Sequence, residues 1–532
     1  MKLQVDGDLR GWIRAHVRAI FVVPLLAFIS LGVWAVASPI GASPDDDYHL
    51  ASIWCAQESR TDLCLPDPDH GSHRLVPPGI AMAPCFVADP EQSAVCQEWP
   101  PVTGPTQSVS HGNWINAYPP LYYAAFNPLA SHDVQGAALT MRFVSIFIFV
   151  ALTTAIAVLI PRDLRVPLLA GWTITMVPLA AHLIASNNPG SWAVIGVGNA
   201  WVAAYGWFRS DGKRAWVLGA LTVLSVLLAA GARTDAAVYA MICLGIASVL
   251  AFARTKAYAL KLILPGALVI IAGIFFLASG NSDVATGGLN GGVDAGTLNG
   301  EPRNQAAVLA FNLISIPMLW SGVFGSWGLG WLMETWPGFS MVEFGAGVVF
   351  IAFVSLGLRI MPWRKATMVV ALVATLYALP VYVLTVGMSV VSENVQPRYL
   401  VPLVIVLGGL MLVGTDKRSV RPTRWHVVPA VILLTVANSV ALYGTLRRYV
   451  TGFDVEQLSL DAGAEWWWDG APVGPTAVWL IGTVAFGLCV GVLGVAWLRF
   501  SALPQVRPDQ SERPGEREAA DEPHRVGSKD GA

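Results

Sequence analysis

The stretch "AIFVVPLLAFISLGVWAVA", residues 19–37, carries no charged side chain and is long enough to cross a bilayer as a helix. About 20 helical residues span the roughly 30 Å of membrane hydrocarbon. Four lysines or arginines lie among the 18 residues before it, and such residues mark the cytoplasmic side. We therefore predict a membrane helix over 19–38 after a cytoplasmic N-terminus, residues 1–18. The "AVAS" at its end resembles a signal-peptidase site, but the length of the run favours a retained anchor.

The rest of the 532-residue chain has the same apolar character. Hydrophobic residues make up 55% and charged residues 13%, with a mean hydropathy of +0.56, which is too apolar for a soluble enzyme. The composition predicts an all-α integral membrane protein with about 12 transmembrane helices. We place them near residues 19–38, 137–160, 166–185, 190–208, 215–231, 236–253, 260–279, 340–361, 366–388, 399–415, 425–443 and 475–498.

Charge sorts the connections between these helices into two sides. Short basic connections such as "PRDLR", "RSDGKR" and "TDKRSVRPTR" are expected in the cytoplasm. The first long loop, residues 39–135, holds eleven acidic residues against two arginines and no lysine, so we expect it outside. Two further extracytoplasmic regions are expected over 280–338 and 444–474, all within a polytopic domain over 19–500.

Two segments do not fit this alternation of spans and loops. Residues 306–331 are apolar enough to span, but a span there would reverse the charge rule at the next basic connection. A re-entrant or interfacial segment on the outer side is therefore expected. The tail, residues 501–532, is rich in charged residues and proline, which predicts a disordered cytoplasmic segment.

Four of the six cysteines lie in the acidic loop: Cys55, Cys64, Cys85 and Cys96. An even number of cysteines in a loop that faces an oxidising compartment predicts two disulfides. Four cysteines permit three pairings, and we favour the local one, Cys55 with Cys64 and Cys85 with Cys96. Reduced, buried thiols are the alternative.

The sequence "ASPDDDYHLASIW", residues 42–54, places three consecutive aspartates just beyond the first span. One interpretation is structural. Ser43 is then the N-cap of a short helix, Pro44 lies in its first turn, and the acids complement the helix dipole.

A catalytic interpretation competes with the structural one. At the outer membrane surface, Asp45 or Asp46 can accept a proton from a sugar hydroxyl while that hydroxyl attacks a glycosyl carbon. Adjacent carboxylates repel, so that one of them can retain its proton or share a divalent cation. Asp47 and His49 are placed to orient a carboxylate or to help hold such a cation.

A lipid phosphate that leaves in this reaction is an anion and needs cations on the same side. Arginine suits phosphate because its planar fork bonds two oxygens at once. The candidates at the outer helix ends are Arg142, Arg233 and Arg398. Snorkelling towards lipid headgroups is the competing interpretation for each, and Asp235 offers Arg233 a local ion pair.

Aromatic side chains gather in the same outer loop, among them Trp114, Tyr118, Tyr122 and Tyr123. Their rings can stack on the apolar faces of a sugar or acceptor. Tryptophan and tyrosine also form the interfacial belts of membrane proteins, so belt and core packing is the alternative.

Six motifs in this order carry a resemblance: "SPDDDYH", "YPPLYY", "SNNPGSW", "RTD", "FGSWGLGW" and "QPRYLVP". Over roughly residues 15–450 the chain resembles the bacterial membrane family known as domain of unknown function 2142. That family is similar, in turn, to the GT-C class of multi-span glycosyltransferases, which take sugars from polyprenyl-phosphate carriers on the outer face of the membrane.

The resemblance implies roles for particular residues. Asp45 and Asp46 match the acidic pair of the GT-C first outer loop, with one of them as the catalytic base, and His49 matches the histidine that follows. The pair is more often Asp-Glu, so that a carboxylate here has a shorter reach. Gly190 stands where an aspartate is common, and the cysteine-bearing insertion over 55–96 has no match in the family pattern and is suited to acceptor recognition.

Three functions follow as hypotheses for a protein of the bacterial cytoplasmic (inner) membrane. The first is transfer of a sugar from a polyprenyl-phosphate donor to a cell-envelope polysaccharide or glycolipid on the extracytoplasmic face. The second is a transporter or flippase, which would need charged residues or broken helices within the spans. The third is a non-catalytic envelope-assembly scaffold. Beyond a possible divalent cation no cofactor is indicated, and a net charge of −2 gives no sign of a nucleic-acid partner. The sequence contains no Walker A motif, so ATP-driven transport by this chain is not indicated.

Overall fold

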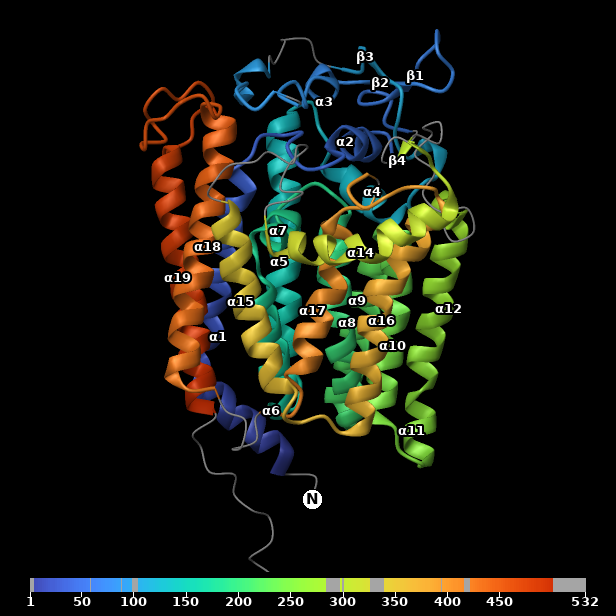
Figure 1. The fold of residues 1–532 in the computed structure, drawn as a ribbon, viewed down its shortest axis with the longest axis vertical. Helices are drawn as coiled ribbons and strands as arrows, with labels where there is room; N and C mark the ends of the chain where they lie inside the picture. The colour runs from blue at the N-terminus through green and yellow to red at the C-terminus, as the bar shows by residue number, and fades with distance from the viewer. Residues whose placement is uncertain are drawn as a thin grey trace, which may run out of the picture.

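The protein is a bundle of long helices whose one end is covered by loops and short elements (Figure 1). The computed structural model describes residues 4–57, 59–87, 89–97, 104–283, 297–298, 301–325, 339–393, 395–415 and 422–500. Helix α1 begins at the opposite end of the bundle and leads to the covered end, which carries residues 37–133 (Figure 1). The expected tail over 501–532 lies outside the described residues, as does most of the region 284–300.

The long helices run along the bundle side by side (Figure 1). They are α1 (Gln4–Val36), α5 (Val134–Leu159), α6 (Arg162–Thr175), α8 (Gly190–Arg209), α9 (Gly212–Ala232), α10 (Thr234–Ala251), α12 (Ile263–Ala278), α15 (Phe339–Gly357), α16 (Trp363–Val386), α17 (Val401–Met411), α18 (Arg424–Val450) and α19 (Pro475–Phe500). The short α11 (Lys256–Lys261) precedes α12 at the end opposite the loops.

Eight helices among the described residues are long and apolar enough to cross a membrane, or nine if one bent pair counts as a span. The protein is therefore an all-α, multi-pass membrane protein, but the expected count of twelve is not established by this measure. Three of the expected spans coincide with shorter apolar stretches, Ile20–Val36, Met341–Gly357 and Val401–Met411. A fourth, α8, is enclosed by other helices, so it need not be as apolar as a lipid-facing helix.

The span expected over 166–185 is a bent pair of helices, which by length and composition could together cross a membrane. Helix α6 stops at Thr175, and α7 (Pro178–Ile184) continues at an angle of 100° to it. Proline has no backbone N–H and disfavours helical geometry in the residue before it, and Val177 is accordingly extended. All seven residues of α7 are buried, so the break lies inside the protein.

Helix α14 (Gln305–Phe324) covers most of the segment expected to be re-entrant or interfacial. By length and composition it could span a membrane. Figure 1 shows its axis running across the bundle, at a steep angle to the helices that it contacts. The remainder of that segment, from residue 326 on, lies outside the described residues.

The covered end is built from short elements. The helical ones are α2 (Asp46–Trp54), α3 (Pro78–Ala81), η1 (Ala94–Cys96), η2 (Asn113–Ile115), α4 (Leu121–Phe126), η3 (Asn127–Leu129), η4 (Gly280–Asp283) and η5 (Pro397–Tyr399). Strands β1 (Leu65–Pro66), β2 (Arg74–Val76) and β3 (Gln107–Val109) form an antiparallel sheet in that order, and β4 (Thr297–Leu298) pairs with β5 (Glu301–Pro302).

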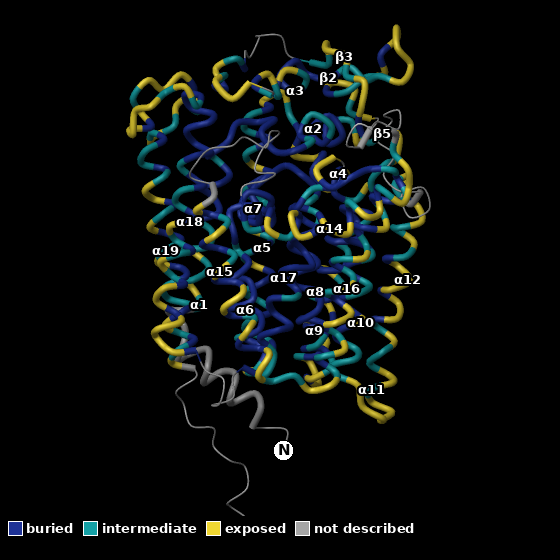
Figure 2. The backbone as a smooth tube through the Cα atoms, in the orientation of Figure 1, coloured by how far each residue is buried: buried dark blue, intermediate teal, exposed yellow. Residues whose placement is uncertain are grey.

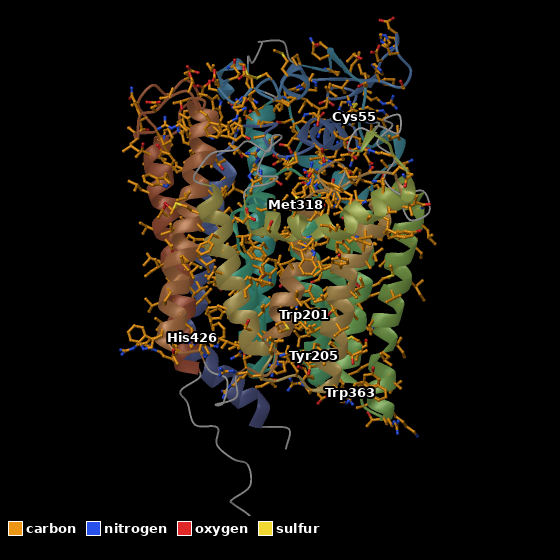
Figure 3. The ribbon with its side chains drawn as sticks, viewed as in Figure 1. Cys55, Trp201, Tyr205, Met318, Trp363 and His426 are labelled. Carbon is orange, nitrogen blue, oxygen red and sulfur yellow. A yellow bond between two sulfur atoms is a disulfide. The ribbon has the colours of Figure 1, made fainter. Side chains whose placement is uncertain are left out.

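The predicted disulfides are confirmed in the favoured local pairing, Cys55 with Cys64 and Cys85 with Cys96. Both tie down irregular segments of the covered end. Figure 3 places Cys55 at this end, whereas Trp363 and His426 lie at the opposite end of the bundle. The disulfide-bearing loop and the basic connections thus lie at opposite ends, as the charge pattern predicts.

Burial follows the arrangement expected in a bilayer (Figure 2). The outer helix α12 exposes Ile270, Ile274 and Leu277 by 60–75%, which favours a lipid environment over water. Inside, α8 and α9 approach closely, because a side chain at Gly196 would lie 2.5 Å from the Ser225 carbonyl oxygen. Far from the covered end, Lys365 Nζ lies 2.6–3.1 Å from four backbone carbonyl oxygens around the ends of α15 and α17.

Candidate functional site

The aspartate triplet lies at the start of α2, but not in the predicted capping arrangement. The N-cap is Asp45 rather than Ser43, and its side chain makes no capping hydrogen bond. Its φ of 61° is left-handed, a conformation uncommon outside glycine but tolerated by aspartate and asparagine. Ser43 is therefore not the N-cap that the structural interpretation expects, whereas Asp46 and Asp47 do lie in the first turn of α2.

The three carboxylates point in three directions. Asp45 is 39% exposed and its Oδ2 accepts a hydrogen bond of 2.6 Å from Arg398 Nη2. Asp46 is completely buried and accepts from the backbone N–H of Ser43 at 3.2 Å. Asp47 lies 2.7 Å from His111 Nε2 at the surface.

These environments separate the protonation of the first two aspartates. Burial raises the pKa of Asp45, but the charges of Arg398 and Arg233 and the hydrogen bond from Arg398 outweigh it and hold that pKa below its usual value. Burial raises the pKa of Asp46 to about 7, because the attraction of Arg142 and the backbone N–H groups offsets it only in part. Asp45 is thus the ionised and accessible carboxylate of the pair.

Arg398, in η5, is the cation nearest to Asp45. Its side chain is 4% exposed, and Nη2 donates to Asp45 and, at 3.2 Å, to the Tyr399 hydroxyl. Its Nε and Nη1 groups are buried and have no hydrogen-bond partner among the described residues. Unpaired guanidinium N–H groups carry a desolvation cost that an anionic ligand would relieve.

Arg233 lies beside Arg398, between α9 and α10. It forms the local pair that the sequence suggested, with Nε 2.9 Å and Nη2 3.2 Å from the carboxylate of Asp235. The guanidinium carbons of Arg233 and Arg398 lie 4.7 and 5.1 Å from the centre of the Tyr399 ring. Two cations on one ring repel each other, so a bound anion would stabilise the arrangement.

A narrow pocket lies between these residues, and its cavity volume is about 10 Å³, the space of one water molecule. Its lining includes Arg233, Asp235, Arg398 and Tyr399, together with Asn188 and Tyr239. We call it the arginine pocket. Asn188 also holds the aspartate segment in place, because its side-chain amide donates to the Pro44 carbonyl oxygen at 2.7 Å.

Tyr118 and His49 lie next to this group, and Tyr123 supports them. Tyr118 approaches Arg233, whose guanidinium carbon is 5.6 Å from its ring centre. His49 is fully buried, and its Nδ1 lies 2.9 Å from the Tyr123 hydroxyl, whereas its Nε2 has no partner among the described residues. Burial lowers the pKa of His49 to about 3, so that the ring is neutral.

Among the described residues, the His49 ring makes no hydrogen bond to an aspartate carboxylate, so its expected role in orienting a carboxylate is not supported. Nor do the described residues place Asp45, Asp46 or Asp47 in any group of three side chains that could hold a metal ion. The expectation of a divalent cation at the triplet is therefore unsupported by geometry, and Asp47 faces His111 instead.

Arg142 does not reach the arginine pocket. It is fully buried in α5, where Nη1 and Nη2 donate at 2.8–2.9 Å to the carbonyl oxygens of Ala35, Ser38 and Pro39. Its Nε donates to Asn187 Oδ1 at 2.8 Å. These bonds satisfy the carbonyl groups at the end of α1, so Arg142 holds the aspartate segment rather than a ligand.

Two of the aromatic candidates also lie elsewhere. Tyr122 is buried against Phe126 and Trp192. Trp114 lies beside the small sheet, where its Nε1 donates to the Ser72 carbonyl oxygen at 3.0 Å. Sequence reasoning missed Tyr399, Asn188 and Tyr239, although the first two stand in motifs already quoted.

A second, apolar cavity with a volume of about 210 Å³ lies among α1, α5, α6 and α19. Helix α7 separates it from the arginine pocket, because Ala181 lines the apolar cavity and Leu183 the arginine pocket. The molecule thus presents a polar and an apolar space on either side of one buried helix.

Comparison with known proteins gives one match. The model of a family described as "Predicted membrane protein (DUF2142)" matches residues 28–407, more than half of the chain. No curated protein and no solved structure matches.

Proposed function

Because the chain belongs to the DUF2142 family of membrane proteins, whose function that description leaves open, we propose from the site itself that it is a glycosyltransferase. It moves a sugar from a polyprenyl-phosphate donor to a cell-envelope polysaccharide or glycolipid on the extracytoplasmic face of the bacterial cytoplasmic membrane. The proposal includes a GT-C-like fold of about 12 spans, with the covered end outside.

One observation carries the proposal: an ionised carboxylate contacts a buried arginine that lines the pocket and has two unpaired N–H groups. Asp45 and Arg398 are in contact at 2.6 Å, and Nε and Nη1 of Arg398 remain unpaired among the described residues. A proton acceptor beside an anion-binding group is what displacement of a phosphate by a hydroxyl requires.

Each of these side chains has one role in the proposed reaction. The acceptor hydroxyl gives its proton to Asp45 Oδ while its oxygen forms a bond to the anomeric carbon. The bond from that carbon to the phosphate oxygen breaks, and the lipid phosphate leaves with the bonding electrons. Arg398 and Arg233 stabilise the phosphate charge, and Tyr118 contributes a ring against the sugar.

The apolar cavity supports a lipid-linked donor. It is lined by side chains such as Val23, Phe149 and Leu493 and has room for part of an isoprenoid chain. Two disulfides at the covered end support an oxidising, extracytoplasmic location for this site.

A second candidate function is a flippase or transporter of a lipid-linked substrate. The 100° break between α6 and α7 favours it, because broken helices form the substrate sites of many transporters. This alternative uses the same arginine pocket but needs no base.

The test is an assay of purified protein in lipid vesicles, with radiolabelled polyprenyl-phosphate sugars and envelope glycan acceptors. We expect transfer by the wild type and a loss of about 100-fold or more in Asp45→Asn, since a general base contributes 10²–10⁴-fold. The matched control is Asp47→Asn, which removes a neighbouring charge that faces His111 rather than Arg398 and should retain transfer.

Flipping of the same donor is measured in parallel. Full transfer in Asp45→Asn would refute the base assignment. Flipping without transfer, unaffected by Asp45→Asn, would replace the enzyme by the transporter.

A further inference from the structure

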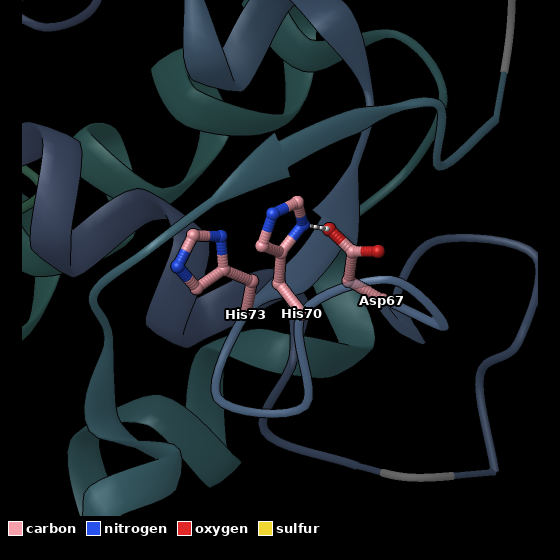
Figure 4. A group of neighbouring side chains, drawn as sticks. All are labelled: Asp67, His70 and His73. Carbon is pink, nitrogen blue, oxygen red and sulfur yellow. Dashed lines mark hydrogen bonds and ion pairs between the residues drawn. The ribbon is translucent and has the colours of Figure 1, made fainter.

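A separate group of side chains lies in the hairpin loop between β1 and β2, in the sequence "DPDHGSH", residues 67–73. Asp67, His70 and His73 converge there (Figure 4). Each offers one ligand atom, and these atoms all lie within 4.8 Å of one another. The group is separate from the arginine pocket, because none of its three residues lines that pocket.

The spacing of the group is close to that of a tetrahedral metal site. His70 Nδ1 lies 3.4 Å from Asp67 Oδ2. Ligand bonds of 2.0–2.1 Å to zinc place neighbouring ligand atoms about 3.3 Å apart in a tetrahedron. Small rotations of the two rings would bring the widest pair, at up to 4.8 Å, to this spacing.

The surrounding residues hold the ligands in place. Ser108, on β3, donates from Oγ to Asp67 Oδ2 at 2.5 Å and lies 3.1 Å from His73 Nδ1. The backbone N–H of Asp69 donates to Asp67 Oδ1 at 2.9 Å. Outer hydrogen bonds of this kind orient the ligands of metal sites.

An ion pair alone does not explain the group. Asp67 needs only one histidine as a partner, yet the His73 ring stacks on the His70 ring at 4.9 Å between centres. The His70 side chain is 63% exposed, so an ion can enter from solvent and keep a water molecule as its fourth ligand. Two imidazoles and one carboxylate suit zinc better than calcium, which prefers oxygen ligands.

We propose that Asp67, His70 and His73 bind one divalent transition-metal ion of the zinc class, with water as the fourth ligand. The ion closes the β1–β2 loop beside the Cys55–Cys64 disulfide. This site goes beyond the proposed transferase function and does not depend on it.

The experiment uses the full chain in detergent, stripped of metal and then titrated with Zn²⁺ and, separately, with Co²⁺. We expect one equivalent of Zn²⁺ to bind and to raise the thermal unfolding temperature, and Co²⁺ to give the intense visible absorption of a tetrahedral site. The double variant His70→Ala/His73→Ala should lose both signals, and Ser108→Ala should weaken binding about 10-fold.

The matched control is His132→Ala, which removes a surface histidine of the same end that pairs with Asp62. It should bind like the wild type. Equal binding by the wild type and the double variant, or a Co²⁺ spectrum without tetrahedral bands, would mean an adventitious ion only and would overturn the proposal.

Discussion

Replacing Asp45 by asparagine should make the protein bind a lipid phosphate more tightly while it turns over more slowly. Asp45 and a phosphate compete for Arg398, whose Nη2 already donates to Asp45 at 2.6 Å. Two unit charges about 4 Å apart attract by about 1 kcal/mol in water and about 4 kcal/mol at an effective dielectric constant of 20. Because Asp45 is 39% exposed and Arg398 only 4%, we expect about 2 kcal/mol.

Release of this competition should tighten phosphate binding about 10- to 30-fold. Asparagine also tolerates the left-handed conformation at this position, so the backbone should be retained. The assay is titration of the purified variant in detergent with a fluorescent polyprenyl phosphate that lacks a sugar. Asp47→Asn, which removes the same charge two residues away, should bind as the wild type does.

Arg398→Gln should show the opposite behaviour and lose binding. Unchanged or weaker binding by Asp45→Asn, with Arg398→Gln at the wild-type affinity, would refute the arginine pocket as the phosphate site.

Three further predictions concern stability. Burial raises the pKa of Asp46 to about 7, so the folded state holds a proton that the unfolded chain releases above about pH 4. The free energy of unfolding should therefore fall as the pH rises from about 4 to 7. In thermal unfolding curves, Asp46→Asn should flatten this pH dependence. Arg142→Met should cost about 3–5 kcal/mol, because it leaves buried carbonyl groups unpaired, and a change in unfolding temperature within error would contradict its structural role. Loss of the Cys55–Cys64 disulfide in a double serine variant should cost about 2–3 kcal/mol, measured by the same unfolding curves under oxidising conditions, since it closes a loop of about ten residues.

Patterns that act over short distances along the chain could be read from the sequence. Apolar runs predicted the membrane helices, because each run must bury its backbone hydrogen bonds within one helix. The local pairing of Cys55 with Cys64 and of Cys85 with Cys96 was predictable for a similar reason, since the partners are only 9 and 11 residues apart. The break before Pro178 has a signal in the sequence, because proline disfavours helical geometry in the residue before it, whereas the hydropathy of the run indicates only an apolar segment.

The candidate site depends on contacts between distant segments. Asp45 and Arg398 are 353 residues apart, and nothing in either motif shows that they meet. Arg142 and Arg398 look equivalent in the sequence, since both are arginines near outer helix ends. In the folded protein, the Arg142 guanidinium donates hydrogen bonds to four protein oxygen atoms. Two N–H groups of Arg398, by contrast, have no partner among the described residues.

Hydropathy and cysteine spacing are local properties, so the amino-acid sequence is enough to predict an all-α membrane protein with an acidic, disulfide-linked loop region. Which aspartate is ionised and accessible depends instead on contacts made in the folded protein. Asp45 and Asp46 are chemically identical neighbours, but the turn into α2 points one towards Arg398 and buries the other completely. Burial and the position of a charge on a distant helix set a carboxylate's protonation, and neither is encoded within a short stretch of residues.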